Sequence, residues 1–129
     1  MKKEIRYPKG LTMLAVALAL VTDAGQRATE QYIPIGQSPG ISGEYARIGT
    51  IDAIDVDARQ MTIATETGPV VVELTENTIV WVDRSELGKA NAAGSLDDLA
   101  EGLEVEVLSE ERERRGEGPA AWIKVRQPS

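Results

Sequence analysis

From Tyr45 to the end of the chain, the sequence is built of short stretches in which apolar and polar residues alternate. The clearest is residues 103–108, where Leu and Val alternate with Glu. Successive side chains on a strand point to opposite faces, so this alternation places one apolar face of each strand against a core. Turn residues interrupt the pattern every few positions, which is typical of an all-β domain.

Several local signals place the ends and bends of these strands. The apolar phase shifts near Ala53, which predicts a β-bulge, and Gly68 occupies the tight turn of a hairpin. Ser95 precedes acidic residues and predicts the N-cap of one helical turn. Six strands are expected, at residues 48–56, 61–65, 69–74, 78–82, 103–108 and 121–126.

Together these elements predict an all-β fold over residues 45–127, a small OB-like barrel of about six antiparallel strands with one short helical turn. Two stacked sheets are the alternative architecture. The core contains Ile, Val, Leu and Met with no Phe, so it is small. Barrel closure would compensate by leaving no bare strand edge.

The order of motifs supports the barrel. The segments GTIDAID, MTIATETGPVVVELTENTIV, SLDDLAEGLEVEV and AAWIKV, spanning about Gly49 to Val125, resemble a bacterial exported domain family of unknown function. The resemblance implies an OB-like small β-barrel and export from the cytoplasm. Its motifs are structural, so it implies no reaction.

The N-terminus reads as a targeting segment. A basic opening is followed by the eleven-residue apolar run Leu11–Val21, short of the roughly 20 residues that a membrane-spanning helix needs. This pattern predicts a secretory signal peptide over residues 1–24, cleaved after Thr22-Asp23-Ala24, and a periplasmic or otherwise exported protein. An uncleaved membrane anchor at residues 5–24 and a buried helix of a cytosolic protein are the alternatives.

Residues 25–44 contain many Gly, Pro and Ser residues and show no periodicity. Two interpretations remain open: a flexible linker, or an arm that docks on the domain or on a partner through Tyr32, Ile33 and Ile35.

Composition excludes several classes of chemistry. The chain has 0 Cys and 0 His, which excludes a thiol nucleophile, a zinc ribbon and a Ser-His-Asp triad. The net charge of -7 argues against binding nucleic acid through its phosphates. We therefore expect no enzyme activity and no cofactor.

Two groups of residues are candidate sites. Trp122, Lys124 and Arg126 are out of phase with the core residues of the last strand, so they predict an exposed partner-binding face, with tryptophans that only cover the barrel ends as the alternative. Both faces of the strand at residues 79–82 are apolar, so the pattern allows Trp81 either to share this outer face or to cap the barrel. Asp52, Asp55 and Asp57 form a weak metal candidate, with solvent-facing turn residues as the alternative.

Glu104 and Glu106 share the outer face of their strand, where we expect them to aid solubility. The leading hypothesis is a non-catalytic envelope module that binds another protein. The alternatives are a membrane-anchored subunit of an envelope complex and a barrel that binds a small ligand or cation.

Overall fold

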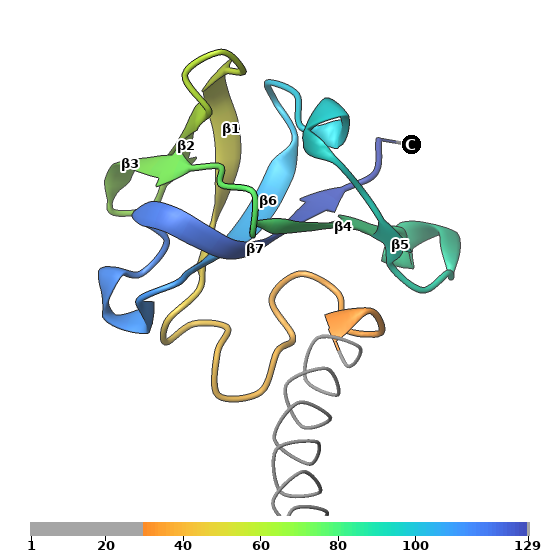
Figure 1. Cartoon of the computed structure of the whole chain (residues 1–129). Helices are drawn as coiled ribbons and strands as arrows, with labels where there is room; N and C mark the ends of the chain where they lie inside the picture. The colour runs from red at the N-terminus through yellow and green to blue at the C-terminus, as the bar shows by residue number, and fades with distance from the viewer. Residues whose placement is uncertain (1–29, 129) are drawn as a thin grey trace, which may run out of the picture. The chain divides into compact units, whose positions relative to one another are not determined.

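The computed structural model describes residues 30–128. Within this range the chain forms seven strands and three single 3-10 turns (Figure 1). The strands are β1 (Arg47–Asp55), β2 (Gln60–Thr65), β3 (Gly68–Glu73), β4 (Ile79–Asp83), β5 (Ala92–Ala93), β6 (Glu104–Ser109) and β7 (Gly118–Arg126). The turns are η1 (Ser85–Leu87), η2 (Leu96–Asp98) and η3 (Arg112–Arg114). The all-β prediction is confirmed.

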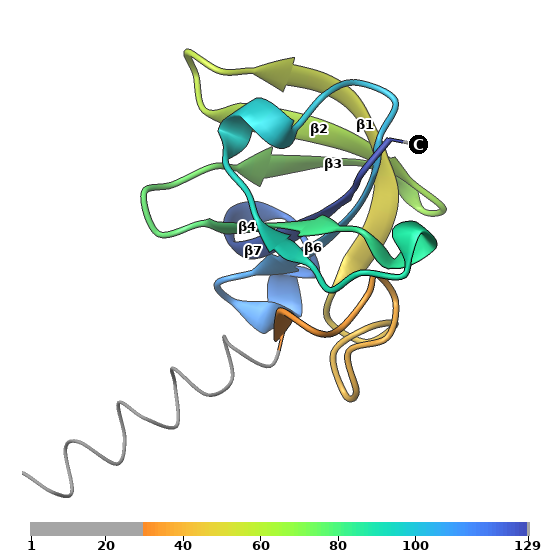
Figure 2. The same ribbon diagram turned by 90° about the vertical axis from the view of Figure 1, so that its right-hand side faces the viewer.

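Five strands close into a barrel in the order β3-β2-β1-β6-β7, and β7 completes the ring by pairing with β3. Figure 2 shows β1, β2 and β3 as neighbouring strands on one side of this ring. The pairings within the ring are antiparallel except for the closing one, in which Val72 and Glu73 run parallel to Gly118 and Pro119. A small closed barrel of this kind is compatible with the OB-like architecture that the sequence predicts.

The remaining two strands extend the sheet beyond the barrel. β4 pairs with β7 in parallel from Ile79↔Trp122 to Asp83↔Arg126, and the two-residue β5 adds an edge. The sequence predicts six strands and purely antiparallel pairing. The structure differs from this prediction in the additional strand β5 and in the two parallel pairings of β7. A two-residue strand gives no periodic signal, and strand direction depends on tertiary arrangement.

The core fills the barrel interior and is lined by alternate residues of the strands. Val105 and Val107 of β6, Ile123 and Val125 of β7, and Ile63 of β2 are all at most 1% exposed. Leu99, which follows η2, joins the same cluster from one end of the barrel. The inward and outward phases predicted for β6 are therefore confirmed.

The predicted local signals also appear. The β1–β2 register shifts between Ile51 and Ala53, which is the expected bulge. Gly68 has φ +118 at the β2–β3 hairpin, a conformation that L side chains rarely adopt. Ser95 caps η2 and forms a capping box with Asp98.

The predicted signal peptide or anchor at residues 1–24 lies outside the described residues. Among residues 30–128 the structure contains no helix long and apolar enough to cross a bilayer.

Candidate functional site

Residues 31–42, here called the strap, lie against the outer wall of the barrel over β4, β6 and β7 (Figure 1). The sequence leaves a spacer and a docking arm open for this stretch. In the structure the strap is bonded to side chains 48 to 86 residues further along the chain. Ile35 and Ser38 are buried against the wall.

Glu106 of β6 holds the middle of the strap. Its side chain points out of the barrel, yet the residue is 0% exposed. The carboxylate accepts the backbone N–H of Gly36 at 3.0 Å and the hydroxyl of Ser42 at 2.6 Å. Because a carboxylate must be hydrogen-bonded to be buried at low cost, these two bonds fix where the strap crosses β6.

Lys124 of β7 stands directly opposite Glu106 in the sheet register and is also 0% exposed. Its ammonium group donates to the Ser38 hydroxyl at 2.9 Å and lies 4.7 Å from the ring centre of Trp122. Trp122 is only 8% exposed and forms a second apolar cluster with Ala46 and Leu108. A buried cation over an aromatic face is electrostatically favourable.

Asp83, at the end of β4, binds the strap from the neighbouring strand. Its carboxylate accepts the backbone N–H of Ile35 at 2.9 Å and that of Ser85 at 2.8 Å, and lies 3.5 Å from Arg126. Burial alone would raise the pKa of Asp83, but the hydrogen bonds from Ile35 and Ser85 and the charge of Arg126 outweigh it and lower the pKa below its ordinary value.

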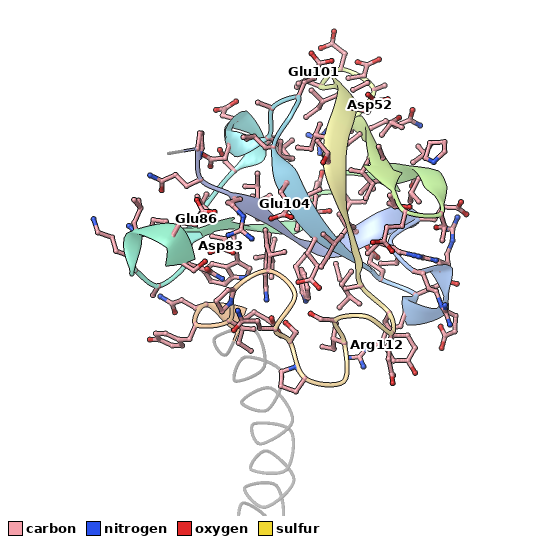
Figure 3. All side chains as sticks on the ribbon, turned by 180° about the vertical axis from the view of Figure 1, so that it is seen from behind. Asp52, Asp83, Glu86, Glu101, Glu104 and Arg112 are labelled. Atoms are coloured by element: carbon pink, nitrogen blue, oxygen red, sulfur yellow. The ribbon has the colours of Figure 1, made fainter. Side chains whose placement is uncertain are left out.

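Arg126 connects this aspartate to Glu104 of β6 and Glu86 of η1. It binds Glu104 at 2.7 Å and approaches Glu86 at 3.8 Å, and Figure 3 shows Asp83, Glu86 and Glu104 gathered in this region. Burial alone would lower the pKa of Arg126, but the hydrogen bond and charge of Glu104, with those of Asp83 and Glu86, raise it. Arg126 therefore stays charged and is engaged within the chain.

The structure corrects the prediction of an exposed face at Trp122, Lys124 and Arg126. Trp122 and Lys124 do point out of the barrel, as their phase predicts, but the strap covers both. The expectation that Glu106 lies open to solvent is wrong for the same reason. The sequence offers two surfaces for partner contact, the strap and the outer wall of β4, β6 and β7. In the structure these two surfaces are hydrogen-bonded to each other.

Trp81 and the apolar residues of the strap differ in how far they are exposed to solvent. Val80 and Val82 pack on the core, which places Trp81 on the outer face beside Lys124, where it is half-buried. Ile33 is half-buried, and Ile35 is 8% exposed. Tyr32 is 70% exposed, so it is the one predicted arm residue whose side chain projects into solvent.

Asn91, before β5, fixes the backbone on both sides of Tyr32. Its N–H donates to the Gln31 carbonyl and its side-chain amide donates to the Ile33 carbonyl, each at 2.9 Å. The loop that Asn91 ends also carries Leu87, which is 49% exposed, and the exposed Lys89. We call Tyr32, Leu87 and Lys89 the corner. The sequence does not single out Leu87 or Lys89, because their loop has no periodic pattern.

The three aspartates of the weak metal candidate do not form a metal site. Asp52, Asp55 and Asp57 are exposed, and the part of the chain that the structure describes contains no group of three or more carboxylates placed to hold a metal ion. Asp55 instead accepts the N–H of Ala58 in the β1–β2 turn, the alternative role that the sequence allows. Asp52 lies at the opposite end of the barrel from the strap, beside Glu101 (Figure 3).

A groove of about 450 Å³ lies beside β1 and is lined by residues 43–44 and 46–50 and by residues 64–66 at the β2–β3 hairpin. Its lining includes Arg47 and Arg115 together with Glu44, Glu66 and Glu104. Mixed charges of this kind define no particular class of ligand. In the described residues, every buried side-chain nitrogen or oxygen has a hydrogen-bond partner.

No protein-family model matches the chain, and the searches of curated proteins and of solved structures give no significant match either.

Proposed function

We propose that this chain is a non-catalytic, exported envelope module that binds another protein through the corner. The observation that carries the proposal is the side chain of Tyr32, 70% exposed on a backbone that Asn91 holds on both sides. Tyrosine is enriched among residues that dominate binding energy, and an anchor that is already ordered loses less entropy on association. Leu87 and Lys89 add an exposed apolar side chain and a cation on the loop that ends at Asn91.

The strap and the wall support this assignment by elimination. Trp122 and Lys124 are covered, and Arg126 is engaged by acidic residues of its own chain. Of the residues that the sequence offers for contact, Tyr32 is therefore the most accessible. Export rests on the basic opening and the short apolar run of residues 1–24, together with the resemblance to exported barrels.

Site-specific crosslinking in the native host tests the corner. A photo-reactive amino acid is placed at Tyr32, at Leu87 or, as a matched control, at Val71, which is 45% exposed on the outer face of β3. We expect the same discrete crosslinked protein from positions 32 and 87 and none from position 71. A Tyr32→Ser/Leu87→Ser double variant with a crosslinker at Lys89 should lose that product. Equal crosslinking at all positions, or none at the corner, would reject the proposal.

The mass of the mature N-terminus tests export separately. A chain that begins at Gly25 supports a cleaved signal peptide. Retention of Met1 in a membrane fraction would instead favour the anchored subunit, and Met1 in a cytosolic fraction would contradict export.

A further inference from the structure

The strap and the wall are complementary surfaces joined by very little chain. Ile35, Gly36, Ser38 and Ser42 supply the strap side of the contacts, and β4, β6 and β7 supply the other. Only residues 43–45, here called the hinge, separate the strap from Ala46 and β1. Any second strap of the same sequence would find the same partners on this wall.

The hinge is a tight reversal of the chain. The Ile41 carbonyl accepts the N–H groups of Glu44, Tyr45 and Ala46 at 3.2, 2.9 and 3.0 Å. Gly43 has φ +82, and a Cβ built there meets no atom within 4 Å. The reversal thus depends on the conformational freedom of glycine at this position and leaves open space around it.

We propose that the outer wall is an interaction surface for a second copy of this chain, which binds by exchanging straps. In the exchanged pair the hinge extends and the strap of each copy lies on the wall of the other. Ser42 still donates to a Glu106 carboxylate, and a Lys124 ammonium still donates to Ser38. The strap is the one segment whose fit to this wall is observed, and exchange of an identical element is a low-cost route to a symmetric dimer.

The closed monomer and the exchanged dimer contain the same strap contacts, so the hinge and the protein concentration decide between them. A short hinge gives the strap an effective concentration in the millimolar range for its own wall, which favours the monomer in dilute solution. A residue that resists positive φ at position 43 penalises the closed hinge and leaves the extended hinge unaffected. It should therefore favour the dimer.

Gly43→Val in the protein as its host produces it provides the test. Both proteins are unfolded in urea, refolded at high concentration and analysed by light scattering after dilution. Because two hinges are relieved in each dimer, we expect the dimer dissociation constant to fall roughly 30-fold to 1,000-fold relative to wild type. The matched control is Gly68→Val, which also has positive φ and an empty surrounding but lies in the β2–β3 hairpin. It should stay monomeric.

Two further measurements separate exchange from other outcomes. In a Trp81→Phe background, Trp122 emission should stay that of a covered indole in the Gly43→Val dimer. An added Glu106→Gln substitution removes the same bonds from the closed monomer and the exchanged dimer, so it should leave the dimer dissociation constant nearly unchanged. It should speed dissociation of the dimer after dilution, because both straps must detach before the copies separate.

A Gly43→Val protein that stays monomeric would overturn the proposal, whether or not Trp122 becomes exposed. A dimer whose dissociation rate is unaffected by Glu106→Gln would place the contact on another face and would also overturn it. None of these results depends on the corner, so this proposal and the proposed function can fail independently.

Discussion

At the scale of single residues, the outer wall carries charges in positions that usually face water. Glu106 and Lys124 are as buried as the core valines. Burial of an ion costs free energy that only close partners offset, and the strap provides them through Gly36, Ser38 and Ser42. Glu106 and Lys124 therefore hold the strap in one place.

Glu106→Ala should lower the free energy of unfolding by about 3 kcal/mol, because the Gly36 N–H and the Ser42 hydroxyl lose their acceptor and Lys124 loses a nearby opposite charge. Urea denaturation measures the change. Glu104→Ala, two residues away on the same face, is the control: the Glu104 side chain is 44% exposed, so we expect less than about 1 kcal/mol. A loss for Glu106→Ala as small as that expected for Glu104→Ala would show that the strap contacts contribute little.

At the scale of elements, β1 and β7 shape the barrel. Each has 9 residues and pairs with different neighbours along its length. β7 meets β3 at its start and β4 at its end, and the pairing of β1 with β2 shifts at the bulge between Ile51 and Ala53. At Gly49, β1 approaches the Ala64 backbone of the neighbouring strand β2 so closely that a Cβ would not fit.

Gly49→Ala should destabilise the protein by about 2 kcal/mol, because its Cβ would lie 2.5 Å from the Ala64 backbone oxygen, and backbone yields less than a flexible side chain. Thermal melting followed by far-UV circular dichroism measures the loss. The neighbouring exposed Thr50→Ala is the matched control and should shift the melting temperature little. A Gly49→Ala protein as stable as wild type would mean that β1 can move away from β2 at no cost.

At the scale of the whole molecule, stability depends on pH through Asp83, whose carboxylate also holds the strap. The chain carries a net charge of -7, and among residues 30–128 Asp83 is one of the few buried acids. Because the pKa of Asp83 is lower in the folded than in the unfolded state, its ionised form stabilises the fold. That contribution is present above the unfolded pKa and is lost as pH falls through the folded pKa.

Asp83→Asn should therefore reduce stability at neutral pH and flatten the fall in stability that wild type shows below about pH 4. Urea midpoints at about pH 6 and about pH 3 give the comparison. Asp52→Asn, an exposed aspartate at the far end of the barrel, should leave the steep acid dependence in place. Parallel pH profiles for wild type and Asp83→Asn would contradict the stabilising role of the ionised carboxylate.

The sequence predicts best the features that depend only on residues close along the chain. The bulge near Ala53, the positive φ of Gly68 and the Ser95 cap each depend on neighbours a few residues away, and all are present. No sequence signal marks β5, because two residues carry no period and its place depends on pairing with Trp81 and Val82 of β4. For the candidate site, the sequence identified Tyr32, Ile35, Trp122 and Lys124 as contact residues without indicating that strap and wall bind each other.

The sequence by itself determined that the chain past Tyr45 forms an all-β domain, and which side of β6 and β7 faces the core, because period-two alternation is a property of the strand alone. Only the tertiary structure decided what lies over the other side. Alternation distinguishes two faces of a strand but does not say whether water or another segment covers the polar one. That depended on carboxylates and an ammonium group finding backbone and hydroxyl partners 48 to 86 residues away in the sequence.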